Sequence, residues 1–260
     1  MKERIQKVLA AAGVASRRHV EEMVRQGRIT VNTKLITELP FMIDPAQDVV
    51  RVDDERVAFP KANREPIYIL LNKPKDVFST NVAQGEQTLA IDLLPPNLGR
   101  RVFPVGRLDA QTKGLLLLTD DGELTQLLTH PRYGIPKTYR ALVDGYVTPE
   151  TLAALEKGIW LSDPQGGKGY KTSGHFHLTK RSRDKSILEV VLREGRNRQV
   201  RRMLAQVGHK VRDLTRIRIG PLTIRGLNPG ESRLLTPREV RQLREMATKK
   251  AEPAKKPRRP

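Results

Sequence analysis

An uninterrupted run of four leucines, from Leu115 to Leu118, constrains the fold of this chain more than any other feature. A short continuous apolar run of this kind, bounded by turn residues, predicts a buried strand. Gly106 and Gly114 lie at the two ends of the preceding loop, where glycine permits tight backbone geometry. Asp120, with Glu123 three residues later, predicts the start of a helix. The segment is therefore expected to form a loop, a buried strand, a turn and a helix.

Asp109 lies in the loop between the two glycines and next to Arg107. Nearby cations can hold a carboxylate in its ionised form. Asp120 and Asp121 are assigned to structure, because acidic residues are common at the start of a helix. Asp109 is therefore the acidic residue of this segment that is a candidate for chemistry.

The first sixty residues have a helical pattern of their own. Apolar residues recur at helical spacing in two segments, at Ile5, Val8, Leu9 and Ala12 and then at Val20, Met23 and Val24. Gly13 ends the first predicted helix and Ser16 caps the second. Residues 28–32 are typical of a strand that enters a turn. Basic residues on or beside the second helix could bind RNA or form an ordinary solvated face: Arg17, Arg18, Arg25 and Arg28.

Beyond a polar linker at residues 59–65, strand and helix patterns mix. Predicted strands are residues 67–71, 115–119, 138–143, 187–192 and 211–219. Predicted helices are residues 123–129, 150–157, 198–207 and 239–246. Because the order has no strict strand–helix–strand rhythm, we expect an α+β fold with a mixed, largely antiparallel sheet flanked by helices. Trp160 is expected in its core.

The composition favours a polyanionic partner. The chain has 48 Lys and Arg against 29 Asp and Glu, for a net charge of +19. Nucleic acid and an anionic membrane surface are the two candidates. No apolar run approaches the ~20 residues of a membrane-spanning helix. The absence of cysteine excludes disulfides and thiolate metal sites and fits a cytoplasmic protein.

Residues 247–260 form a basic, proline-containing segment without bulky apolar residues. It is expected to be a disordered tail that contacts RNA or keeps the protein soluble. His175 and His177 are two residues apart, but no third ligand lies nearby in the sequence, so no metal site is expected.

Several segments of the sequence resemble two known families. The segments 4–13, 16–18 and 27–32 resemble the S4 RNA-binding domain, which implies a small domain of two helices and a sheet over residues 1–58. The run from Gly106 to Leu124 closely resembles the signature of the RsuA/RluB class of pseudouridine synthases. Lys137-Thr138-Tyr139 and the segment 194–203 resemble two further motifs of that class. The resemblance implies a catalytic domain over residues 66–246.

The resemblance also implies roles for individual residues. Asp109 would be the nucleophile, or else the base at C2′ of the ribose. Arg201 would form an ion pair with Asp109, with Arg196 as second choice. Tyr139 would pack on the uracil and Leu192 would form an apolar wall. Arg107 would fill the space that the flipped base leaves. Arg198, in the motif at residues 194–203, would bind RNA. The reaction needs no cofactor or metal.

The expected substrate is ribosomal RNA, with the large subunit favoured by the Gly-Arg-Asn-Arg-Gln form of the third motif. A small-subunit rRNA enzyme and a non-catalytic S4-type assembly factor are the alternatives. A tRNA-acting enzyme would need adenylate-binding signatures, which the sequence lacks, and a membrane-surface protein would rest on the basic tail alone. The chain is expected to be monomeric.

Overall fold

The computed structural model describes residues 2–59, 64–163 and 166–249. The chain divides into two compact units, residues 1–66 with 99–101 and residues 67–98 with 102–260. Arg100 links the segment 99–101 to the first unit, since it donates a hydrogen bond of 2.7 Å to the carbonyl oxygen of Glu65. Each unit has a hydrophobic core of its own.

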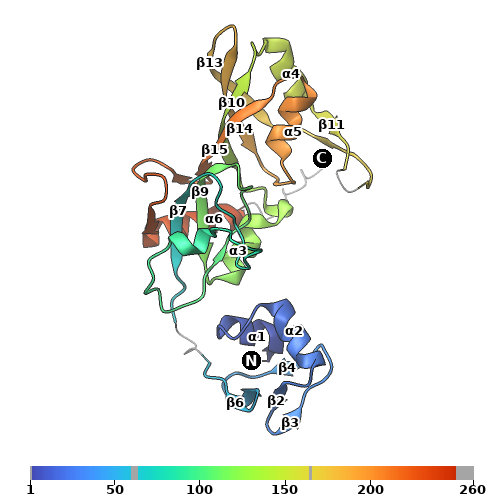
Figure 1. Cartoon of the computed structure of the whole chain (residues 1–260), viewed down its shortest axis with the longest axis vertical. Helices are drawn as coiled ribbons and strands as arrows, with labels where there is room; N and C mark the ends of the chain where they lie inside the picture. Colours follow the sequence, from blue (N-terminus) through green and yellow to red (C-terminus); the bar gives the residue numbers. More distant parts are fainter. Residues whose placement is uncertain (1, 60–63, 164–165, 250–260) are drawn as a thin grey trace, which may run out of the picture. The chain divides into compact units, whose positions relative to one another are not determined.

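The N-terminal unit packs two helices against short strands (Figure 1). Its elements are α1 (Ile5–Ala11), α2 (Arg17–Arg25), β1 (Glu3–Arg4), β2 (Ile29–Val31), β3 (Lys34–Leu35), β4 (Met42–Ile43), β5 (Val50–Val52) and β6 (Glu55–Arg56). The strands pair in the order β3-β2-β5-β6, and β1 pairs with β4. Ser16 caps α2 as predicted, by accepting a hydrogen bond of 3.2 Å from the amide of His19. Phe59, predicted to begin the linker, packs against this core instead.

The second unit is built on a large sheet with the strand order β13-β14-β10-β15-β9-β7-β17. Its strands are β7 (Tyr68–Lys73), β8 (Phe103–Pro104), β9 (Lys113–Thr119), β10 (Lys137–Asp144), β13 (His175–Arg181), β14 (Lys185–Leu192), β15 (Val211–Ile219), β16 (Leu222–Thr223) and β17 (Ser232–Leu234). All the pairs are antiparallel except that of β15 with β9. The predicted α+β fold with a mixed, largely antiparallel sheet is confirmed.

Helices cover this sheet at two places (Figure 1). They are α3 (Gly122–Thr129), α4 (Pro149–Lys157), α5 (Gln199–Gln206) and α6 (Pro237–Lys249), with short 3-10 helices at Ala90–Leu93 and Pro131–Tyr133. Helices α4 and α5 pack on the end formed by β10, β14 and β15, whereas α3 and α6 pack beside β7 and β9. A hairpin of β11 (Ile159–Leu161) and β12 (Tyr170–Thr172) lies next to α5.

The leucine run lies in β9 and is buried as predicted. Leu115 and Leu117 pack in the core with α3 and α6, whereas Leu116 and Leu118 pack in a second core on the other face of the strand. The run is uninterrupted because neither face of β9 meets water.

Gly114 allows the parallel contact between β9 and β15. It pairs with Arg216 and has a φ of 104°. A Cβ atom at this position would lie 2.2 Å from the carbonyl oxygen of Arg216, so any side chain would push the strands apart. Glycine therefore fixes the junction at which the loop containing Asp109 joins the sheet.

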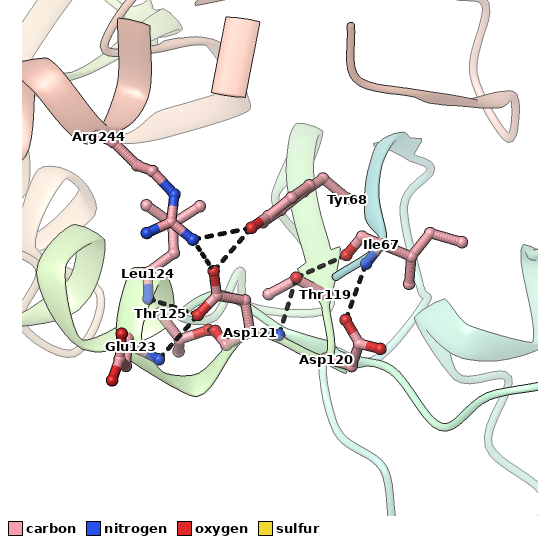
Figure 2. Close-up of polar contacts among 9 residues, drawn as sticks. All are labelled: Ile67, Tyr68, Thr119, Asp120, Asp121, Glu123, Leu124, Thr125 and Arg244. Atoms are coloured by element: carbon pink, nitrogen blue, oxygen red, sulfur yellow. Dashed lines mark hydrogen bonds and ion pairs between the residues drawn. The ribbon is translucent and has the colours of Figure 1, made fainter. Parts of the chain in front are cut away.

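Asp121, rather than Asp120, caps α3. Its carboxylate accepts hydrogen bonds from the amides of Glu123 and Leu124 at 3.0 and 2.9 Å (Figure 2). It also accepts one from the hydroxyl of Tyr68 at 2.7 Å and one from Arg244 of α6 at 2.5 Å. Burial is the main cause that raises the pKa of Tyr68 to about 12. The prediction of the cap is therefore off by one residue, while the assignment of Asp121 to structure is confirmed.

Two further predictions are wrong. Ala247 was placed at the start of a disordered tail, yet it lies in α6 and is fully buried in the core with Leu243. Residues 250–260 lie outside the described residues. Trp160 was expected in the core but is 64% exposed, because β11 turns its neighbour Leu161 inward.

Candidate active site

The loop that carries Asp109 is held on several sides. The ammonium group of Lys73, fully buried, donates hydrogen bonds to the carbonyl oxygens of Val77 at 2.7 Å and Ala110 at 3.3 Å. The amide of Asp76 donates a bond of 2.8 Å to the same oxygen of Ala110. Burial lowers the pKa of Lys73 to about 8, although Asp76 and Asp109 act in the opposite direction. These bonds fix the backbone at Asp109 before any substrate binds.

Asp109 forms its ion pair with Arg198, at 3.8 Å. The Asp109 side chain is 32% exposed and that of Arg198 47% exposed, so the pair lies at the mouth of the site. Arg198 directly precedes α5 in a left-handed conformation with a φ of 47°. A non-glycine residue in this conformation costs free energy, and such residues cluster at functional sites.

The predicted partner of Asp109 was Arg201, and the structure corrects this. The guanidinium of Arg201 donates hydrogen bonds to the carbonyl oxygens of Gln111 at 2.8 Å and Val211 at 3.2 Å. Burial is the main cause that lowers its pKa, while the charge of Asp109 acts in the opposite direction. Arg201 therefore stabilises the backbone of the loop that carries Asp109, rather than pairing with the carboxylate of Asp109.

Arg196, the second choice, is also engaged elsewhere. It forms an ion pair of 3.2 Å with Glu194, and its guanidinium lies 3.9 Å from the ring centroid of Tyr170. Gln199 donates hydrogen bonds to Glu194 at 2.6 Å and to Thr172 at 2.7 Å. Burial raises the pKa of Glu194, but hydrogen bonds from Thr172, Arg196 and Gln199 outweigh it, so the net shift is downward. Glu194 and Gln199 belong to the motif recognised in the sequence, whereas nothing in the sequence indicates Thr172.

A cavity of about 360 Å³ opens beside Asp109. Predicted site residues that line it are Arg107, Asp109, Tyr139, Leu192, Arg196 and Arg198. They come from the loop before β9, from β10, from the end of β14 and from the segment before α5. Arg107 is exposed, Tyr139 is half-buried and Leu192 is buried. Arg201 is not among the lining residues.

Sequence reasoning missed several residues of this cavity. Thr112, Lys137, Leu214 and Arg216 also line it. Burial, and after it the charge of Arg216, lowers the pKa of Lys137 to about 8. Lys137 belongs to the Lys-x-Tyr motif and could have been found from it. Arg216 lies in the predicted strand 211–219, where nothing distinguishes it from other strand arginines.

The predicted RNA-binding arginines of the N-terminal unit differ in whether their side chains have a partner. Arg25 pairs with Glu22 at 2.6 Å, and Arg28 forms two hydrogen bonds with Asp53 at 2.8 and 2.5 Å. Arg17 and Arg18 are exposed at the start of α2, and neither has a side-chain partner in the part of the chain that the structure describes. Among the described residues, Arg17 and Arg18 are therefore the members of this set that no carboxylate pairs with.

Two other features of the described chain bear on function. Within residues 2–59, 64–163 and 166–249, no three His, Cys, Asp or Glu side chains are grouped closely enough to hold a metal ion. His175 contacts Glu156 at 2.8 Å. None of the helices in these ranges is both long and apolar enough to cross a membrane.

Comparison with known proteins agrees with this geometry. Residues 67–206 match the family model described as RNA pseudouridylate synthase, and residues 3–50 match that of the S4 domain. Ribosomal large subunit pseudouridine synthase B of Bacillus subtilis is 42% identical over 245 residues, which cover 94% of this chain and 97% of that protein. An uncharacterised RNA pseudouridine synthase of Aquifex aeolicus is 40% identical, with 94% of each chain covered. A crystal structure of a pseudouridylate synthase, at 29% identity, has a TM-score of 0.64 and covers 92% of this chain and 99% of its own. The chain therefore belongs to the RNA pseudouridylate synthase family and carries an N-terminal S4 domain.

Proposed function

We propose that this enzyme converts a uridine of large-subunit ribosomal RNA to pseudouridine, with Asp109 as the catalytic carboxylate. The observation that carries the proposal is the cavity of about 360 Å³, because Asp109, Tyr139 and Leu192 line it together with basic residues. A carboxylate, an apolar wall and an aromatic ring suit a flipped base, while the arginines suit the RNA backbone around it.

The reaction breaks the bond from ribose C1′ to uracil N1 and forms a bond from C1′ to C5. It is an isomerisation, so no group is lost and nothing is oxidised. The carboxylate of Asp109 can attack C1′, or it can remove the proton at C2′. In both routes the positive charge of Arg198 stabilises the ionised carboxylate of Asp109 and orients this carboxylate. The proton that leaves C5 is assigned to Tyr139, which also packs against the ring.

Arg107 is assigned to the space that the base leaves. Its side chain is exposed, and it lies two residues before Asp109. Flipping a base out of its stack costs a few kcal/mol, and a long cation that enters the gap offsets part of this cost. Because a guanidinium is planar, it can stack on the neighbouring bases.

Large-subunit RNA is favoured by two observations. The Bacillus subtilis relative is named as a large-subunit enzyme, and the third motif has the Gly-Arg-Asn-Arg-Gln form. The S4 domain provides a second RNA-binding surface. We assign Arg17 and Arg18 of this surface to phosphate contacts, because both are exposed and neither has a side-chain partner among the described residues.

The proposal is tested by tritium release from rRNA labelled at C5 of uridine. Wild type should release tritium from unmodified large-subunit RNA, and Asp109→Asn should release none while RNA affinity stays within a few-fold. Asp184→Asn is the matched control, since Asp184 is exposed in the turn between β13 and β14, away from the cavity.

Tritium release from small-subunit RNA alone would support the proposed reaction but contradict large-subunit RNA as the substrate. Tight binding without release from either RNA, or from pre-ribosomal particles, would favour a non-catalytic assembly factor.

A further inference from the structure

A guanidinium with an unused donor lies in the wall of the Asp109 cavity. Arg216 of β15 lines this cavity and is only 2% exposed. Its Nε donates a hydrogen bond of 2.7 Å to the carbonyl oxygen of Leu115, which fixes the side chain against β9. Its Nη2 is buried and has no hydrogen-bond partner among residues 2–59, 64–163 and 166–249. Buried donors are rarely left unpaired, because the lost hydration costs about 1–3 kcal/mol.

Thr112 provides a second polar group of this kind. It is also 2% exposed and lines the same cavity, and its hydroxyl likewise has no partner within the described residues. Thr112 directly precedes β9, whose first residues pair with Thr215 and Arg216 of β15. Two unpaired polar groups therefore come from adjoining positions of the β9–β15 junction. Neither takes part in the mechanism described above.

Arg216 and Thr112 lie deep in the cavity, where a flipped base can reach them more readily than a phosphate of the RNA backbone can. Asp109 and Arg198 are 32% and 47% exposed, whereas Arg216 and Thr112 are almost fully buried. A phosphate stays on the RNA strand and meets the exposed arginines first. A flipped uracil enters with its ribose near Asp109, so that the edge farthest from the ribose reaches deepest. That edge carries the O4 carbonyl.

We propose that Nη2 of Arg216 donates a hydrogen bond to O4 of the flipped uracil, with Thr112 at the same buried edge. The inference rests on the proposed function and adds the residue that recognises the base. Cytosine has an amino group in place of O4, so it would present a donor to a donor. Sites built to hydrogen-bond a substrate group reject analogues that lack it, because their own polar groups then remain unpaired. Arg216 would therefore discriminate uridine from cytidine.

The test replaces single atoms of the substrate. The probe is a large-subunit rRNA transcript on which wild type releases tritium, with uridine, 4-thiouridine or 2-thiouridine at the reacting position. Sulfur accepts hydrogen bonds weakly. Under single-turnover conditions, followed by nucleoside chromatography, wild type should be at least about tenfold slower on 4-thiouridine than on uridine. It should be within about threefold on 2-thiouridine.

Arg216→Met completes the comparison. It should slow the reaction of uridine by at least about tenfold, change RNA affinity by less than about threefold, and no longer distinguish 4-thiouridine from uridine. An intrinsic effect of sulfur on the chemistry would persist in this variant and would contradict the proposal. Arg218→Met is the matched control, because Arg218 is exposed on the same strand. Arg216→Lys, which keeps the charge, replaces Arg216→Met if the latter does not fold.

Three other outcomes are informative. Equal rates of wild type on uridine and 4-thiouridine overturn the inference without any variant. A loss of RNA affinity in Arg216→Met, with unchanged discrimination between the analogues, would mean that Arg216 binds a phosphate. If wild type releases no tritium from any rRNA, the proposed function fails and this inference fails with it.

Discussion

At the scale of single residues, two arginines of the segment around α5 have separate tasks. Arg198 forms the ion pair with Asp109, whereas Arg201 donates to the carbonyl oxygens of Gln111 and Val211. Loss of the first removes a charge beside the carboxylate, and loss of the second leaves backbone acceptors without their donor. The two substitutions should therefore differ in what they damage.

We expect Arg198→Met to lower the single-turnover rate by about tenfold or more and to leave the melting temperature nearly unchanged. Arg201→Met should lower the melting temperature by several degrees, since about 1–3 kcal/mol of hydrogen bonding is lost at a half-buried site. Thermal denaturation and tritium release on the same preparations measure both. Arg225→Met, at an exposed residue outside the cavity, is the control. The reverse pattern would show that Arg201 is the partner of Asp109 after all.

At the scale of elements, the start of α6 is a capping box. Glu239 accepts hydrogen bonds from the amide of Thr236 at 2.9 Å and from Arg233 at 2.9 and 2.7 Å. The amide of Glu239 in turn donates to the hydroxyl of Thr236 at 3.3 Å. The bond from Arg233 is the main cause that lowers the pKa of Glu239 from 4.5 to about 2. Because α6 carries Leu243 and Ala247 into the core, this cap supports the cluster that α6 forms with α3, β7 and β9.

The lowered pKa of Glu239 predicts a pH dependence. A carboxyl whose pKa is lower in the folded state stabilises the protein above its unfolded pKa of 4.5 and loses this contribution as the pH falls toward 2. Glu239→Gln should therefore lower the free energy of unfolding by about 1 kcal/mol at neutral pH, and the gap to wild type should close in acid. Thermal denaturation at several pH values measures it. Glu245→Gln, at an exposed residue of the same helix, should show no such gap.

At the scale of the whole molecule, two truncations distinguish the effect of the basic residues 250–260 on RNA binding from the effect of the end of α6 on stability. Residues 250–260 add Lys250, Lys255, Lys256, Arg258 and Arg259 against Glu252 alone. Removing them should weaken RNA binding at low salt and reduce the dependence of affinity on salt, without changing the melting temperature. Removing residues 247–249 as well should lower the melting temperature, because Ala247 is buried in the core. Filter binding at two salt concentrations and thermal denaturation measure the two effects. An unchanged salt dependence would mean that this segment does not contact RNA.

Features that depend on neighbouring residues could be predicted from the amino-acid order. The leucine run predicted β9, the helical spacing of apolar residues predicted α1 and α2, and Ser16 predicted the cap of α2. The motif around Asp109 predicted the loop before β9, and that loop lines the cavity. These features are local, because periodicity and capping act over a few residues along the chain.

Contacts between groups that are distant in the sequence could not be predicted, because they depend on how the elements pack. Arg216 contacts a residue 101 positions away, and Arg201 one 90 positions away. No local pattern says whether Arg196, Arg198 or Arg201 reaches Asp109. The three lie within six residues, and their directions depend on how the segment before α5 and the helix itself pack against the sheet. The prediction for Trp160 was wrong for the same reason, since the elements that pack on a short strand decide which of its side chains are buried. Motifs therefore predict which residue types gather at the site, while the packing of β9, β15 and α5 decides the partner of each.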